Sequence, residues 1–395
     1  MNKIYLKASV AAFIAYLVLL IICPEWQICL FYDRCGDFGA DYFNVCRYVA
    51  DADPYGNTLN GPTEHSGLPL GYLWKYIFAQ TADYSSMSLH DCWHNVWGCI
   101  IPFLFVSLFR IGFLGFALME YAKKYTSIKP IYLTPIFLSS IFLFSVERGN
   151  SILLTVSLII LFLVYYDSPS PAKRWLAMLF LSISGIFKVV PGLLCLLYLK
   201  DRRFKEFFLL VGITLVLIFL PFLCFKGGFD NILLVPERMF MQVSVYGAKF
   251  TCYRFGFLSL ANLLGVLSGW SGWLVVGRIM PYLMLLASVT MFFLSRDRNK
   301  SVLYLLFVLA LFAGSASPYN DLYLFPLFIY TLASGDSRSK AFILLLFFFI
   351  MQPIQIVFAD QSLSWILANI CSLTLWIYIL ASDAVNLYRV RRITK

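Results

Sequence analysis

The 395-residue chain is far more apolar than a water-soluble protein, with 61% AVILMFWYC residues, 13% charged residues and a mean hydropathy of +0.79. A soluble domain has too little interior to hide 38 Phe, 24 Tyr and 9 Trp side chains beside so few charges, so soluble-enzyme functions are excluded. The formal charge of +10 does not indicate nucleic-acid binding, because basic residues at the ends of membrane helices account for it.

Apolar runs along the chain predict an all-α integral membrane protein with about twelve transmembrane helices. The first run follows a basic N-terminus and lacks a small-residue cleavage site, so we interpret it as a retained span and not as a signal peptide. The predicted spans are 8–23, 95–119, 130–146, 150–166, 175–187, 189–199, 206–225, 272–295, 301–317, 320–334, 340–358 and 362–385.

The distribution of basic residues predicts the orientation of these spans. Most of the 31 Lys and Arg residues fall on the side of the N-terminus, which indicates that both termini are cytoplasmic in a multi-pass protein of the inner (plasma) membrane. Residues 1–395 are predicted to form one polytopic domain, with long extracytoplasmic segments at 24–94 and 226–271 and short inner loops. The chemistry should therefore face outward, below amphipathic interfacial helices at 71–79 and 255–267.

The first outer segment carries the acidic cluster of the protein. Asp37 and Asp41 follow the first span, and Asp53-Pro54-Tyr55 comes shortly after them. A carboxylate just outside the membrane is well placed to act as a general base on the hydroxyl of a surface-facing substrate. The alternative is that these carboxylates solvate a loop in which Asp53-Pro54 begins a turn.

A tight outward turn is predicted at Glu147-Arg148-Gly149-Asn150, between two apolar runs. Gly149 and Asn150 suit a helix end with positive φ and need no further role. Glu147 and Arg148 lie close to bilayer depth and require partners, so they either bind a ligand or organise a site.

Lys188 stands at the apex of a hairpin with arms at 175–187 and 189–199. Arms of this length reach roughly 16–20 Å, less than a hydrocarbon core of about 30 Å, so the apex should lie below the outer surface. A cation held at that depth favours an anionic partner such as phosphate. Alternatively, Lys188 snorkels to water or pairs with an outer carboxylate such as Glu147.

Other outer residues are weaker candidates. His90 and His94 are four residues apart, so a metal pair is conceivable, but a clear third ligand is lacking and no metal site is predicted. The alternative is that the three histidines, including His65, are interfacial loop residues or hydrogen-bond donors to phosphate. Lys249 and Arg254 stand among aromatic residues, a mixture that suits a sugar or lipid-phosphate site and equally an aromatic belt.

A last outward turn lies at Ser317-Pro318-Tyr319-Asn320-Asp321. The polar groups of this turn are predicted to face the same cavity as the first outer segment. The alternative is a simple turn in which Asp321 caps a helix.

Taken together, these positions resemble the polytopic GT-C glycosyltransferases, most closely the bacterial family usually numbered eighty-seven, which contains polyprenyl-phosphate-dependent mannosyltransferases. The resemblance covers nearly the whole chain. One departure is Gly67-Leu68-Pro69-Leu70, where that family usually has an aromatic-Pro-Pro segment. The motifs that carry the resemblance are Asp37-Phe38, Asp53-Pro54-Tyr55, Arg148-Gly149-Asn150, Lys188-Val189-Val190-Pro191 and Ser317-Pro318-Tyr319.

The resemblance implies a GT-C-type bundle and inverting transfer of a hexose from a polyprenyl-phosphate donor to a hydroxyl of a lipid-linked glycan or glycolipid. Asp37 would be the base, with Asp41 as the second candidate. Phosphate is a good leaving group, so no metal or other cofactor is expected. Expected partners are donor, acceptor and membrane lipids, not nucleic acid. The implied donor-phosphate ligands are Lys188, Arg148, Arg254 and Lys249, and the implied substrate-binding residues are Tyr42, Tyr55, Glu147, Asn150, His65 and Asn320.

Two other classes of protein fit the same composition. A secondary transporter or a lipid or oligosaccharide flippase also needs charged residues at depth, but no internal repeat is visible and the inner loops are mainly positive. A glycan polymerase or ligase that uses a lipid-diphosphate donor would depend on an arginine pair instead of Asp37.

Overall fold

The computed structural model describes residues 1–27, 30, 38–57, 59, 61, 65–247, 255–312, 317–358 and 361–393. Within these ranges the chain is helical apart from loops and one small hairpin, in which β1 (Val357–Phe358) pairs antiparallel with β2 (Gln361–Ser362). Contacts divide the chain into two compact units. The first comprises Met1–Cys29, Thr126–Leu143 and Gly247–Lys395, and the second comprises Leu30–Tyr125 and Phe144–Tyr246.

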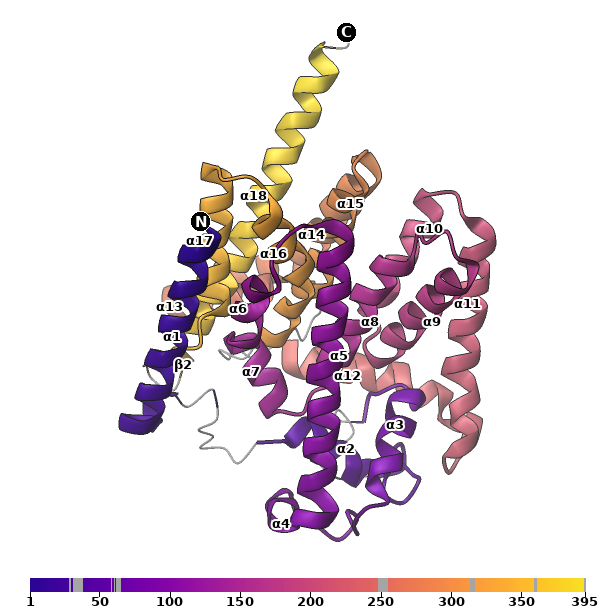
Figure 1. The fold of residues 1–395 in the computed structure, drawn as a ribbon. Helices are drawn as coiled ribbons and strands as arrows, with labels where there is room; N and C mark the ends of the chain where they lie inside the picture. Colours follow the sequence, from indigo (N-terminus) through magenta and orange to yellow (C-terminus); the bar gives the residue numbers. More distant parts are fainter. Residues whose placement is uncertain are drawn as a thin grey trace. The chain divides into compact units, whose positions relative to one another are not determined.

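The helices are labelled in chain order in Figure 1. The first unit contains α1 (Asn2–Ile22), η1 (Pro24–Gln27), η4 (Pro130–Leu133), α6 (Thr134–Phe137), α13 (Phe257–Ser268), α14 (Gly272–Leu294), α15 (Arg298–Leu311), η8 (Pro318–Leu324), α16 (Phe325–Ala333), α17 (Arg338–Met351) and α18 (Leu363–Ile393), and α7 (Ser140–Glu147) crosses its boundary. The second contains α2 (Ala40–Val49), α3 (Pro69–Ala79), α4 (Leu89–His94), η3 (Val96–Ile100), α5 (Ile101–Tyr125), α8 (Ile152–Tyr165), α9 (Pro171–Phe187), η5 (Val190–Cys195), α10 (Leu196–Lys200), α11 (Phe204–Phe219), η6 (Leu220–Cys224), η7 (Gly228–Leu233) and most of α12 (Leu234–Gly247).

Five helices in the described part of the chain are long and apolar enough to cross a membrane, or six if the pair Pro130–Phe137 and Ser140–Glu147, bent by 58°, forms one span. Much of their apolar surface is not covered by protein: on α11, Phe208 is 69% exposed and Val216 is 57% exposed. Apolar surface of this kind is stable against lipid and not against water. The prediction of an all-α membrane protein is therefore confirmed.

The predicted count of twelve spans is a finer statement than these helices support, and it stays a prediction. Several predicted spans correspond to shorter helices. The 14-residue helix α8, for example, is about 21 Å long at 1.5 Å per residue, less than the hydrocarbon thickness of about 30 Å. The five long candidate spans are Asn2–Ile22, Val96–Tyr125, Phe204–Cys224, Gly272–Leu294 and Leu363–Leu387.

Each unit is built around one helix that is buried on every side. In the second unit every residue of α8 from Ile152 to Val164 is buried, and α5 and α9 pack against it. In the first unit α15 is buried from Ser301 to Leu311, and it contacts α14, η8 and α18. A helix that is apolar all round can satisfy its surface only in such a central position.

From residue 38 onward, the described residues of the predicted first outer segment belong to the second unit and pack against its other helices. Its helices α2, α3 and α4 gather around one end of the long helix α5 (Figure 1). Aromatic residues of the segment, including Tyr42, Tyr55 and Tyr84, share one buried cluster with Phe103 of α5 and Phe222 of η6. Helices are present at both predicted amphipathic stretches, as α3 and α13.

Close packing of α13 on α14 generates the first testable prediction. A Cβ atom at Gly277 would lie 2.5 Å from the Cβ of Ala261, so Gly277→Ala should destabilise the protein by about 1–3 kcal/mol. Thermal unfolding of purified protein in detergent measures the effect. Gly212→Ala is the matched control, because nothing lies within 4 Å of its added Cβ. Equal melting temperatures for the two variants would contradict this packing.

Candidate functional site

The start of α2 packs on the turn between α7 and α8. Helix α7 ends at Glu147, and Gly149 takes φ +63°, the left-handed conformation that the sequence predicted for this helix end. The amide of Gly39, the residue before α2, donates to the carbonyl of Glu147 at 3.0 Å. This backbone contact joins two segments that are about a hundred residues apart in sequence.

Asp41, in the first turn of α2, is the centre of the resulting cluster. Its Oδ1 accepts from Arg148 through Nη2 at 3.0 Å and Nε at 3.3 Å, and its Oδ2 accepts from Asn150 Nδ2 at 2.5 Å. The Asn150 amide is oriented from its other side, because its Oδ1 accepts from the backbone N–H of Ile152 at 2.8 Å. The first turn of α2 is thereby joined to the turn at Arg148-Gly149-Asn150.

The charges around Asp41 keep it ionised. Burial alone would raise the pKa of this carboxyl, but the charge and hydrogen bonds of Arg148, the hydrogen bond of Asn150 and the charge of Lys188 lower it below the usual value. The Asp41 side chain is 25% exposed. Its low pKa and its bound oxygens make Asp41 a weak base and a good anchor for Arg148.

Lys188 lies at the break predicted from its hairpin. It is the C-cap of α9, its amide donates to the carbonyl of Ser184 at 3.0 Å, and η5 begins two residues later. Its charge is close enough to lower the pKa of Asp41. The structure therefore brings together four residues predicted for one site: Asp41, Arg148, Asn150 and Lys188.

Two further cations, which the sequence reasoning missed, lie behind this cluster. Arg110 of α5 is 1% exposed, and its Nη1 donates to the carbonyls of Gly149 at 2.7 Å and Asn150 at 3.3 Å. Lys75 of α3 is 4% exposed, and its ammonium lies 3.8 Å from the ring centroid of Tyr42. An arginine isolated within an apolar run is a signal that could have pointed to Arg110.

Burial and the charge of Arg110 hold the pKa of Lys75 well below its usual range. The neighbouring Cys46 thiol and Asp41 carboxylate act in the opposite direction but with smaller effect. Among the described side chains around Asp41, positive groups outnumber negative ones. This arrangement favours the approach of an anion.

Other predicted substrate-binding residues have structural partners. Tyr55 is buried, and its hydroxyl donates to the carbonyl of Gly67 at 3.1 Å. His65 is buried with its ring nitrogens 2.9 Å and 2.6 Å from the carbonyls of Pro54 and Leu59. Asp53 accepts from the amide of Gly56 at 2.8 Å, which confirms the alternative interpretation of Asp53-Pro54 as a turn.

Asn320 belongs to the first unit, within η8. Its backbone N–H donates to the carbonyl of Ser317 at 2.8 Å, as expected of a turn. The neighbouring Asp321 is 1% exposed and accepts from the hydroxyl of Ser372 at 2.5 Å. Asp321 is thus a buried acceptor inside the first unit.

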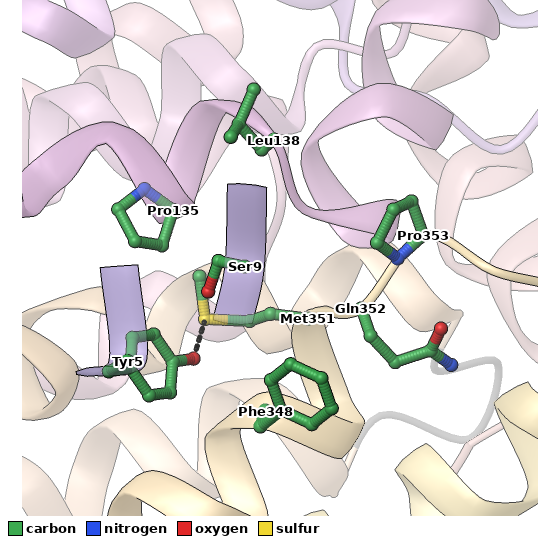
Figure 2. Close-up of a pocket in the computed structure, with 8 residues that line it drawn as sticks. All are labelled: Tyr5, Ser9, Pro135, Leu138, Phe348, Met351, Gln352 and Pro353. Atoms are coloured by element: carbon green, nitrogen blue, oxygen red, sulfur yellow. Dashed lines mark hydrogen bonds between the residues drawn. The ribbon is translucent and has the colours of Figure 1, made fainter. Parts of the chain in front are cut away.

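A pocket in the first unit is shown in Figure 2, where the Tyr5 hydroxyl points at the Met351 sulfur 3.7 Å away. Its volume of about 10 Å³ holds one water molecule at most. Apart from Tyr5 and two polar side chains, Ser9 and Gln352, its lining is apolar and carries no charge. We do not assign a substrate to it.

Asp37, Lys249 and Arg254 lie outside the described residues. Within the described ranges, no group of three or more His, Cys, Asp or Glu side chains is arranged to hold a metal ion. The exposed His90 and His94 rings face each other with their Nε2 atoms 3.3 Å apart.

No family model, curated protein or solved structure matches this chain. The arrangement around Asp41 is therefore the basis for inferring a function.

Gly149 generates a prediction about how this cluster is held. An added Cβ would lie 2.7 Å from both Phe103 and Tyr42, and the backbone has positive φ, so Gly149→Ala should destabilise the protein by about 2–4 kcal/mol. Gly112→Ala in α5, with nothing within 4 Å of its new Cβ, should have no such effect. Thermal unfolding in detergent compares them, and an unaffected Gly149→Ala protein would show that the turn is not so constrained.

Lys75 generates a prediction about stability and pH. Lys75→Met removes a buried amine without removing its alkyl packing, so it should stabilise the fold by about 1–3 kcal/mol near neutral pH. Because the folded pKa is lowered, the gain should shrink as pH rises toward the ordinary lysine value of 10.5, where the unfolded amine also loses its proton. Unfolding measured at several pH values tests this, with the exposed Lys226→Met as control. A destabilised Lys75→Met protein would contradict it.

Proposed function

We propose that this protein is a polytopic membrane glycosyltransferase of the GT-C type. It transfers a hexose from a polyprenyl-phosphate donor to a hydroxyl of a lipid-linked glycan or glycolipid on the extracytoplasmic face. The observation that carries the proposal is the ionised Asp41 carboxylate, held by Arg148 and Asn150 beside Lys188. A cationic site with one organised carboxylate, set in an apolar helical protein, suits a substrate that is both a lipid and a phosphate ester.

In the proposed reaction the acceptor hydroxyl oxygen bonds to the anomeric carbon while the bond from that carbon to the phosphate oxygen breaks. The electron pair leaves with the phosphate, and the hydroxyl proton passes to a carboxylate. Charge grows on the phosphate oxygens in the transition state, so cations fixed beforehand lower the barrier. The proposed phosphate ligands are Lys188, Arg148, Lys249 and Arg254.

Asp37 is the proposed base, and Asp41 is the proposed positioning residue. Three donor atoms occupy the Asp41 oxygens and its pKa is lowered, so Asp41 is poorly suited to accept a proton near neutral pH. Asp37 precedes Asp41 by four residues in the same acidic segment. Glu147, Asn150 and Tyr42 would then shape the site, and Tyr55, His65 and Asn320 stay proposals for substrate-binding residues.

The membrane arrangement completes the proposal. We propose twelve spans, cytoplasmic termini and an inner-membrane location, with the polyprenyl tail reaching the site sideways between helices. The exposed apolar faces of α5 and α11 support a lateral route for a lipid: Phe105 on α5 is 66% exposed and Phe208 on α11 is 69% exposed.

The decisive test is transfer of labelled sugar from a panel of polyprenyl-phosphate monosaccharides to cell-envelope acceptors by the purified protein in lipid. Asp37→Asn should lower the rate by about 10²–10⁴-fold, because the base is lost. Asp41→Asn should release Arg148, which lowers both the rate and the thermal stability. Asp230→Asn is the matched control, since that carboxylate is exposed and lies in η7 of the same unit.

Full activity of folded Asp37→Asn protein would overturn the assignment of the base. Absence of transfer from every donor, with native acceptors present, would overturn the glycosyltransferase proposal. A transporter or flippase, or a lipid-diphosphate-dependent polymerase or ligase, would then be the better interpretation.

A further inference from the structure

Arg110 and Arg148 use their guanidinium groups differently, although they contact the same turn. Arg148 directs its Nε and Nη2 atoms at the carboxylate oxygen of Asp41. Arg110 holds the turn with Nη1 alone, and among the described residues its Nε and Nη2 atoms have no hydrogen-bond partner. The Nε and Nη2 donors form the edge of a guanidinium that binds two oxygens of an oxyanion side by side.

Lys75 adds a second buried basic group, close enough for the charge of Arg110 to act on it. Its Nζ atom likewise has no hydrogen-bond partner within the described part of the chain, and it lies over the ring of Tyr42. Gly149, whose carbonyl binds Arg110, packs directly on Tyr42: an added Cβ there would be 2.7 Å from the Tyr42 Cβ. Lys75 and Arg110 therefore approach the Tyr42–Gly149 contact from α3 and α5.

We propose that Lys75 and Arg110 form a binding site for a phosphate-type oxyanion behind the Asp41–Arg148 pair. Two oxygens of the anion are bound by the Nε–Nη2 edge of Arg110, and a third is bound by the Lys75 ammonium. A tetrahedral oxyanion offers this number of acceptors and a negative charge, whereas a neutral sugar hydroxyl leaves the charge of Arg110 uncompensated. The oxyanion site rests on the proposed function only for the identity of its ligand, which would be a polyprenyl phosphate.

Asp41 does not compete for the ligand's place, because Arg148 and Asn150 already occupy its oxygens. The donor atoms of Lys75 and Arg110 are inaccessible to water in this structure. An arriving oxyanion has to displace the Lys75 ammonium from the Tyr42 ring, a contact that a flexible four-carbon side chain can exchange for an ion pair.

The test is equilibrium binding to the full-length protein in phosphatidylcholine nanodiscs, with three probes: a polyprenyl phosphate, the corresponding polyprenol and inorganic phosphate. Wild-type protein should bind the polyprenyl phosphate and not the polyprenol. Lys75→Met should weaken that binding by about tenfold or more, as expected from loss of a charged hydrogen bond. Lys226→Met, which removes an exposed cation from the same unit, should bind as wild type does. Arg110→Lys is the second variant, because it keeps the charge and loses the two-donor edge, and it should weaken binding as well.

The outcomes separate the sources of the ligand and the two proposals. Inorganic phosphate that binds with the same dependence on Lys75 identifies a site for free oxyanions, and binding of the lipid alone identifies a headgroup site. Unchanged affinity in folded Lys75→Met and Arg110→Lys proteins, or equal binding of the polyprenol, overturns the oxyanion site. Binding that depends on Lys75 in a protein with no transferase activity would leave the site standing and overturn the proposed function. Sugar transfer by a Lys75→Met protein that binds polyprenyl phosphate as wild type does would overturn the oxyanion site and leave the proposed function standing.

Discussion

The ion pair between Asp41 and Arg148 is the contact on which the arrangement of the second unit depends. It joins α2, in the first long outer segment, to the turn between α7 and α8, and Asn150 and the Gly39 amide reinforce the same junction. A charged pair that is only about a quarter exposed is strongly orienting, because neither partner can turn away without leaving a charge poorly solvated. The pair therefore helps to orient α2 on the turn between α7 and α8, together with the aromatic cluster around Tyr42 and Phe103.

Buried basic groups in the second unit lower its stability. Arg110 and Lys75 are almost completely buried, and burial of basic groups with incomplete pairing destabilises a fold. Apolar packing offsets this cost, as in the fully buried helix α8 and in the aromatic cluster around Tyr42 and Phe103. Proteins keep unfavourable groups of this kind where function uses them, which is why the cations, and not the water-sized pocket near Tyr5, carry the functional inference.

Much of the site could be predicted because some of its features are local. The positive φ of Gly149 follows from glycine's lack of a Cβ at the end of an apolar helix, and Lys188 at a helix end follows from the short arms on either side. Which groups would meet could not be derived in this way. The Asp41–Arg148 contact spans 107 residues, and Lys75 and Arg110 come from two further helices, so only packing brings them together.

The sequence by itself determined the class of the protein, since its apolar fraction and long hydrophobic runs leave a helical membrane protein as the stable solution. It also determined the positions of several helix ends and of the amphipathic helices α3 and α13, because those depend on neighbouring residues. Tertiary structure decided that Tyr55 and His65 hydrogen-bond to backbone carbonyls and that Asp41 is tied to Arg148. It also decided that two unpredicted cations lie behind that pair. The physical reason is that burial and electrostatic partnership are properties of groups distant in sequence, which hydrophobic periodicity does not encode.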